Sequence, residues 1–203
     1  EERQEMQRKM RECGDNEIER EYWDKRQLVK KINLNSLYGA ILNPGCRFFD
    51  MRIGQSVTLT GRCITQHMAS KVNEVVTGEY DHKGKSIVYG DTDSVYFSAF
   101  KTLQKEIKEG VIPWTKDSVV ALYDKIADEV NGSFKSFMTK AFHTPSTRGE
   151  VIAAGRELVA SKGLFITKKR YAVLYYDKEG KRADVEGKDG KMKAMGLDLK
   201  RSD

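Results

Sequence analysis

The sequence predicts an α+β fold, in which an antiparallel sheet packs on helices and one helical element projects from it. Two observations lead to this class. Long segments of strong helix formers open the chain, and short runs of β-branched and aromatic residues, separated by turn residues, fill much of its second half. Successive strands at hairpin spacing pair antiparallel, so the order helices, hairpin, helix and strands favours α+β over a parallel sheet.

The helical segments come first. Residues 1–42 are strong helix formers without proline, and only Gly14-Asp15-Asn16 interrupts them, which predicts a short helix, a turn and a second helix from about Glu17. Apolar residues then keep the spacing of one helical face in residues 55–76 and again in residues 116–141. Each of these two segments predicts a helix with one buried face.

The strand segments begin with two short runs, residues 86–89 and 95–97, on either side of Gly90-Asp91-Thr92-Asp93-Ser94. This spacing predicts a hairpin with acids in its turn. Further strands and turns follow from alternation and from glycine. They are strands at residues 150–154, 163–177 and 192–195, and hairpin turns at Gly180 and at residues 187–190.

The composition is that of a globular domain and suits a polyanionic partner. Hydrophobic residues make up 39% of the chain, and 36 Lys and Arg against 30 Asp and Glu give a net charge of +6. Cys13, Cys46 and Cys63 form no zinc-spaced cluster, which favours reduced thiols. The sequence has no apolar run of the roughly 18 residues that a membrane span needs and opens on no apolar signal segment, so we expect a soluble, cytoplasmic protein without a membrane partner.

Asp91 and Asp93 are the first candidate site residues. Two carboxylates two residues apart on a tight turn can converge on Mg²⁺, which prefers oxygen ligands and takes one or two carboxylates from a protein beside substrate phosphates. The same Asp-Thr-Asp-Ser sequence is also an ordinary polar turn. Residues 91–95 further fit the DxDx(T/V) pattern of haloacid-dehalogenase-like phosphatases, but that pattern normally follows the first strand of a parallel α/β domain.

A second candidate is a polar stripe on the helix that begins near residue 17. Lys31, Asn35 and Tyr38 are spaced i, i+4 and i+7 and therefore share one helical face. Such a stripe could present a cation to a triphosphate and a phenol to a base or sugar. The alternative is a solvated face with Tyr38 packed at a domain junction.

Three motifs give the chain a specific resemblance. Residues 31–39, Lys-Ile-Asn-Leu-Asn-Ser-Leu-Tyr-Gly, match the Kx3NSxYG motif of family B DNA polymerases, and residues 89–94, Tyr-Gly-Asp-Thr-Asp-Ser, match their YxDTDS motif. Residues 168–171, Lys-Lys-Arg-Tyr, are similar to their KKRY-type signature. The motifs occur in family order, and their style is most similar to that of the T-even-like bacteriophage replicative members.

This resemblance implies a nucleotide-binding role for the polar stripe. In the family, the lysine at the position of Lys31 contacts the incoming triphosphate, and Asn35 would lie beside the same phosphates. Tyr38 would lie on the minor-groove side of the nascent base pair, where acceptor positions are shared by all correct pairs. Gly39 would leave room beneath it.

The resemblance also assigns metal-binding roles. Asp93 would be the shared ligand of two Mg²⁺ ions, and Asp91 would lie near the primer terminus with a looser role. Glu150 resembles a further palm carboxylate on a neighbouring strand, although an ordinary exposed glutamate is an equal alternative.

The basic motif would contact DNA. On the long strand expected at residues 163–177, the period of two places Lys169 and Tyr171 on one face, which the resemblance turns toward the primer. Lys168 and Arg170 share the other face and could reach phosphates, where contacts hold position and not sequence. A solvated basic strand is the alternative.

The resemblance divides the chain into residues 1–46, the distal part of the fingers, and residues 47–203, the palm, of a DNA-directed DNA polymerase. The motif DxxSLYPS, which supplies another metal-binding Asp, is absent from the sequence, as are exonuclease motifs and a thumb. With Glu at residue 1 and no capping signal before the first helix, we expect a piece of a larger or split enzyme that is inactive alone.

The expected partners follow from the same resemblance. They are primer–template DNA, a deoxynucleoside triphosphate and the remainder of the polymerase, and the resemblance leaves a sliding clamp open. The alternative function is a non-catalytic nucleic-acid-binding or assembly module that keeps the fold without the chemistry.

Overall fold

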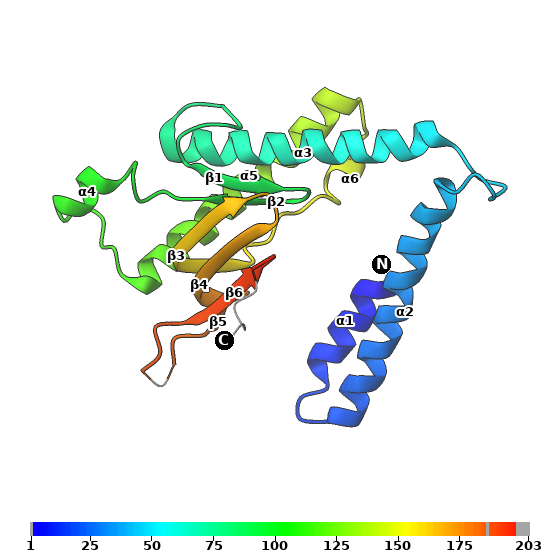
Figure 1. Cartoon of the computed structure of the whole chain (residues 1–203), viewed down its shortest axis with the longest axis horizontal. Helices are drawn as coiled ribbons and strands as arrows, with labels where there is room; N and C mark the ends of the chain where they lie inside the picture. Colours follow the sequence, from blue (N-terminus) through cyan, green and yellow to red (C-terminus); the bar gives the residue numbers. More distant parts are fainter. Residues whose placement is uncertain (1, 186, 198–203) are drawn as a thin grey trace. The chain divides into compact units, whose positions relative to one another are not determined.

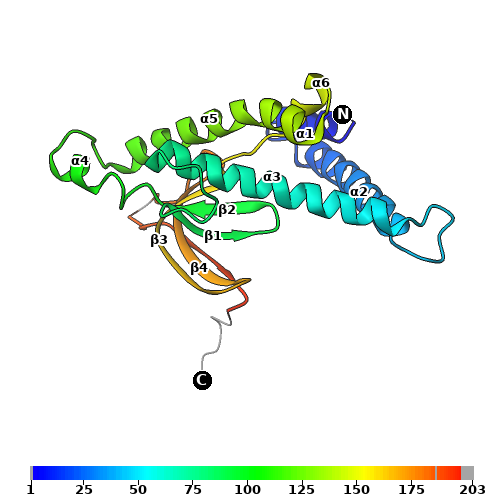
Figure 2. The same ribbon diagram turned by 90° about the horizontal axis from the view of Figure 1, so that it is seen from above.

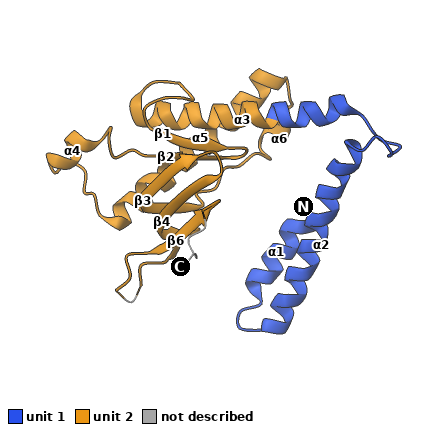
Figure 3. Cartoon of the chain, in the orientation of Figure 1, with its two compact units in different colours: residues 1–60 blue, residues 61–203 orange. Residues whose placement is uncertain are grey.

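The computed structural model describes residues 2–185 and 187–197, which form two compact units, residues 1–60 and residues 61–203 (Figure 3). Helices and antiparallel strands both contribute, so the predicted α+β class is confirmed. No helix in the described part of the chain is long and apolar enough to cross a membrane.

The first unit is a helical hairpin followed by the start of a long helix. Helix α1 (Glu2–Glu12) packs along α2 (Glu17–Ile41), and α3 begins at Met51 and continues to Thr77 in the second unit (Figure 1). Asn16 caps α2 by accepting a hydrogen bond from the Glu19 amide at 3.2 Å. The helices expected before residue 42 and at residues 55–76 are therefore confirmed.

The second unit contains two antiparallel sheets (Figures 1 and 2). Strands β1 (Ile87–Asp91) and β2 (Ser94–Phe97) form the predicted hairpin. In the larger sheet, β4 (Arg170–Lys178) pairs with β3 (Leu158–Thr167), β5 (Lys181–Arg182) and β6 (Lys191–Met195). The strand at 192–195 and the turn at Gly180 are thus confirmed, the latter with φ of 79°.

Helix α5 (Lys116–Phe142) packs against both sheets and forms a hydrophobic core with each. Its apolar face packs with α3 and the β1–β2 hairpin around Val72, Val130 and Phe134. Nearer its start, Val119 contacts Val159 of β3 and Tyr176 of β4. Two short helices, α4 (Gln104–Lys108) and α6 (Ser146–Gly149), flank α5 in the sequence. The predicted helix at 116–141 therefore forms and buries one face, as expected from its periodicity.

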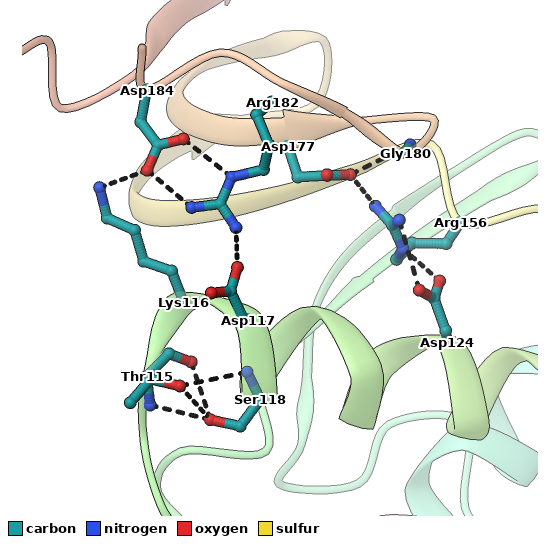
Figure 4. Close-up of polar contacts among 10 residues, drawn as sticks. All are labelled: Thr115, Lys116, Asp117, Ser118, Asp124, Arg156, Asp177, Gly180, Arg182 and Asp184. Carbon is teal, nitrogen blue, oxygen red and sulfur yellow. Dashed lines mark hydrogen bonds and ion pairs between the residues drawn. The ribbon is translucent and has the colours of Figure 1, made fainter. Parts of the chain in front are cut away.

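Ion pairs join the larger sheet to α5 (Figure 4). Arg156, which precedes β3, bonds Asp124 of α5 and Asp177 of β4. Arg182 of β5 bonds Asp184 and Asp117, and these hydrogen bonds raise the pKa of its guanidinium. Side-chain bonds from Arg182 and then Lys116 hold the pKa of Asp184 well below its usual range.

The strand predicted at residues 150–154 is wrong. Residues 146–149 form α6, and the segment that follows makes no strand ladder. Instead, the side chain of Asn131 on α5 accepts from the Ala154 amide at 2.7 Å and donates to the Ala154 carbonyl at 2.9 Å. Ile152 and Ala154 still pack on the core. Two residues spaced as on a strand face are thus partly buried, but a side-chain amide takes the place of a neighbouring strand.

The single long strand predicted at residues 163–177 is also wrong. It is a hairpin whose two-residue turn is Lys168-Lys169, with Thr167 opposite Arg170. Lys169 adopts φ of 61°, a conformation uncommon for a non-glycine residue, and residues 167–170 include no Gly, Asn or Pro to signal a turn. The face assignment of Lys168, Lys169 and Arg170 is overturned with it.

A buried histidine joins α3 to α5. His67 is 8% exposed, and its ring stacks on Phe137 with centroids 3.9 Å apart. Its Nε2 lies 2.9 Å from the Ser133 hydroxyl, which itself donates to the Val130 carbonyl at 2.6 Å. Nε2 must therefore donate, and Nδ1 lies 2.7 Å from the Tyr80 hydroxyl. Burial, followed by the charge of Lys71, lowers the pKa of His67 and so favours the neutral imidazole, in which Nδ1 accepts from Tyr80.

We expect the stability of the chain to fall on mild acidification because of His67. Its folded pKa is lowered below the unfolded value of about 6.5, so the unfolded chain takes up the proton first. The stabilisation is present above about pH 6.5 and is lost as pH falls through the folded pKa. Urea unfolding of wild type and His67→Gln between pH 7.5 and 5 checks this, with His82→Gln, whose side chain is 40% exposed, as the control. Equal pH slopes in wild type and His67→Gln would contradict the assignment.

Candidate active site

The acidic hairpin places the two predicted carboxylates on either side of a two-residue turn. Asp91 ends β1 opposite Ser94, and Asp93 occupies the turn with Thr92, whose φ is 52°. The Asp91 side chain is 16% exposed and accepts from the Thr92 hydroxyl at 3.1 Å, whereas Asp93 is exposed. The turn thus presents one sheltered and one open carboxylate.

The acidic hairpin is anchored to α3 at both its ends. At the turn, the Thr65 hydroxyl donates to the Thr92 carbonyl at 2.9 Å. At the start of β1, the fully buried Asn73 accepts from the Ser86 hydroxyl at 2.8 Å and donates to the Glu79 carbonyl, also at 2.8 Å. Sequence reasoning missed Thr65 and Asn73, because polar residues on a helix give no signal of a partner distant in sequence.

The turn Lys168-Lys169 between β3 and β4, which we call the basic turn, lies next to the acidic hairpin. The ammonium of Lys168 is 3.8 Å from Asp91 Oδ1 and is largely exposed, so the ion pair is weak. The Lys169 amide donates to the Tyr89 hydroxyl at 2.8 Å. Lys168, Lys169 and Arg170 all have exposed side chains. The structure therefore brings the acidic motif and the basic motif together.

Four aromatic rings join these hairpins, and we call them the four-ring cluster: Tyr89, Tyr96, Phe165 and Tyr171. Tyr89 opposes Tyr96 across β1–β2, and Phe165 opposes Tyr171 across β3–β4. Every ring contacts the other three, with centroids 5.2–5.9 Å apart. Such pairs contribute about 0.5–1.5 kcal/mol each beyond the area they bury.

Tyr171 belongs to this cluster and not to an exposed strand face. It is 5% exposed, and its hydroxyl accepts from that of Tyr96 at 3.2 Å. Burial, followed by the hydrogen bond with Tyr171, raises the pKa of Tyr96 well above its usual range. The Tyr96 phenol therefore stays neutral, and Tyr171 packs within the cluster on the strand that follows the Lys168-Lys169 turn.

Glu150 lies at the end of α6 and not on a strand. Its carboxylate is half exposed and pairs with Lys135 of α5 at 2.5 Å. Within residues 2–185 and 187–197, no three acidic, histidine or cysteine side chains form a group that could hold a metal ion. Asp91 and Asp93 could supply the one or two carboxylates that a protein usually contributes to Mg²⁺.

The polar stripe lies in the first unit, on α2. Lys31 and Asn35 are exposed, and Tyr38 is half-buried with its hydroxyl donating to the Gly54 carbonyl at 3.3 Å. A side chain built at Gly39 would meet no atom within 4 Å. The stripe and the acidic hairpin thus belong to different compact units.

Comparison with known proteins identifies relatives of the whole segment. The sequence model of DNA polymerase family B matches residues 1–203. The chain is 34% identical to the DNA-directed DNA polymerase of Escherichia phage RB69 over 87% of its own length and 31% identical to that of Enterobacteria phage T4 over 87%. It is 28% identical to DNA polymerase 1 of Pyrococcus abyssi over 89%. The chain spans about a fifth of the length of these curated relatives.

Proposed function

Because the chain belongs to DNA polymerase family B, we propose that it forms part of the nucleotidyl-transfer site of a DNA-directed DNA polymerase. The observation that carries this proposal is the contact between the acidic hairpin and the basic turn, where Lys168 lies 3.8 Å from Asp91. Carboxylates for a metal and cations for a phosphate backbone are the two components that such a site must bring together.

In this proposal different residues of the chain bind the metal and the DNA. Asp93, exposed at the turn, and Asp91, sheltered at the end of β1, hold Mg²⁺. Two bound ions would help ionise the primer 3′-hydroxyl and neutralise the leaving pyrophosphate. Lys168, Lys169 and Arg170 contact the DNA backbone, whereas Tyr171 is buried in the four-ring cluster. Glu150 is an auxiliary carboxylate at most, because it already pairs with Lys135.

The incoming nucleotide is assigned to the polar stripe. Lys31 and Asn35 contact its triphosphate, and the ring of Tyr38 lies against the nascent base pair with Gly39 beneath. We accordingly assign residues 1–46 to the distal fingers and residues 47–203 to the palm. The parallel fold that a haloacid-dehalogenase-like phosphatase needs does not agree with the antiparallel hairpin that carries Asp91.

We expect this chain to extend a primer only when it is combined with the missing part of the site. Two-metal chemistry needs carboxylates on more than one side of the ions, and the hairpin supplies one side. Mixing the chain with a family B segment that carries DxxSLYPS should give Mg²⁺-dependent extension, and the chain alone should give none. DNA binding without extension by the mixture would favour the non-catalytic module instead.

A further inference from the structure

The Tyr89 hydroxyl, on the β1–β2 hairpin, accepts a hydrogen bond from a strained residue of the β3–β4 hairpin, Lys169. Lys169 has φ of 61°, which costs free energy in a residue with a side chain, and such a conformation persists where its surroundings hold it. The Lys169 amide donates to the Tyr89 hydroxyl at 2.8 Å. Tyr89 therefore contacts the strained residue itself and not merely the strand beside it.

Tyr89 is also tied to the metal-binding acid. It precedes Asp91 by two residues on the same strand, and its ring is fixed by the other members of the four-ring cluster. Lys168, which precedes Lys169 in the turn, has its ammonium 3.8 Å from Asp91 Oδ1. Tyr89 is thus linked to Asp91 along β1, and it is linked to Asp91 a second time through the basic turn, whose Lys168 ammonium lies beside that carboxylate.

We infer that Tyr89 is a positioning residue whose hydroxyl holds the backbone of the basic turn, and with it the backbone of Lys168, beside Asp91. A DNA phosphate held by the turn is then fixed relative to the acids. This inference rests on the proposed function for its consequence in catalysis, whereas the hydrogen bond can be tested without any activity. The residue acts through the turn and does not itself contact a reacting group.

The first test measures amide hydrogen exchange of Lys169 by NMR in this chain. Tyr89→Phe keeps the ring in the cluster and removes only the hydroxyl. Because one hydrogen bond contributes about 1 kcal/mol, exchange at Lys169 should become about fivefold faster. Tyr96→Phe, which removes the hydroxyl that bonds Tyr171, is the matched control and should leave Lys169 unchanged. Equal exchange in wild type and Tyr89→Phe overturns the inference.

The second test measures primer extension in the reconstituted mixture described above. We expect Tyr89→Phe to lower kcat about three- to tenfold while the nucleotide KM changes less than about twofold, because the lysines themselves remain. Tyr123→Phe, far from both turns in sequence, is the control for losing a phenol. An unchanged kcat despite faster Lys169 exchange overturns the positioning role. If the wild-type mixture extends no primer, the proposed function fails, and the exchange result still decides whether Tyr89 holds the turn.

Discussion

Asp93→Ala is expected to abolish Mg²⁺-dependent primer extension by the reconstituted polymerase, with a loss of about 10³-fold or more. Asp93 is the exposed carboxylate of the acidic hairpin, so it is the more accessible of the two proposed metal ligands. Metal ions supply several kcal/mol of charge stabilisation in such a reaction, and about 4 kcal/mol corresponds to three orders of magnitude. Single-turnover extension rates at saturating nucleotide measure the effect.

Further variants compare the contribution of each acid to primer extension and test whether a lower rate reflects unfolding. Asp91→Asn should cost less than Asp93→Ala, since Asp91 is sheltered and faces Lys168. Glu150→Gln should have little effect, because its partner is Lys135 on α5. Asp189→Ala, an exposed acid in the β5–β6 connection, should match wild type. Extension by Asp93→Ala at the wild-type rate would refute the metal assignment, and an unchanged urea midpoint shows that a loss of extension is not a loss of fold.

The acidic hairpin was predictable from sequence because all its signals are local. Apolar strands lie on both sides of a polar five-residue segment, and glycine and aspartate favour a turn. The helices were predictable for the same reason, since their periodicity is contained within each segment. By contrast, the contact between Asp91 and Lys168 joins residues distant in sequence, and periodicity carries no information on such pairs.

The basic turn and residues 150–154 show where local signals mislead. Alternation with a period of two is the same in one long strand and in a tight hairpin, so only turn residues can separate the two cases. Lys168-Lys169 carries none, and its conformation is held by Tyr89. At residues 150–154, a side chain of α5 replaces the expected neighbouring strand. In both places tertiary contacts override the local pattern.

Arg156→Ala is expected to cause the largest loss of stability in the second unit. Its guanidinium bonds Asp177, whose side chain is 3% exposed, and Asp124, whose side chain is half exposed. Burial opposes the charge of Arg156, but its bonds to Asp124 and Asp177 raise its pKa nonetheless. Removing the arginine leaves the Asp177 carboxylate buried with the Gly180 amide at 3.2 Å, and an unpaired buried charge costs about 3–5 kcal/mol.

Urea unfolding followed by circular dichroism measures this loss, and a double variant tests its cause. Arg8→Ala removes an exposed arginine paired at 3.8 Å with Glu12 and should cost less than about 0.5 kcal/mol. If the penalty comes from the orphaned carboxylate, then adding Asp177→Asn to Arg156→Ala should recover part of the stability, because the neutral amide is cheaper to bury. A double variant less stable than Arg156→Ala would instead show that Asp177 matters mainly through packing and through its bond to Gly180, so that the arginine serves as a spacer between α5 and β4 and not as a counter-ion.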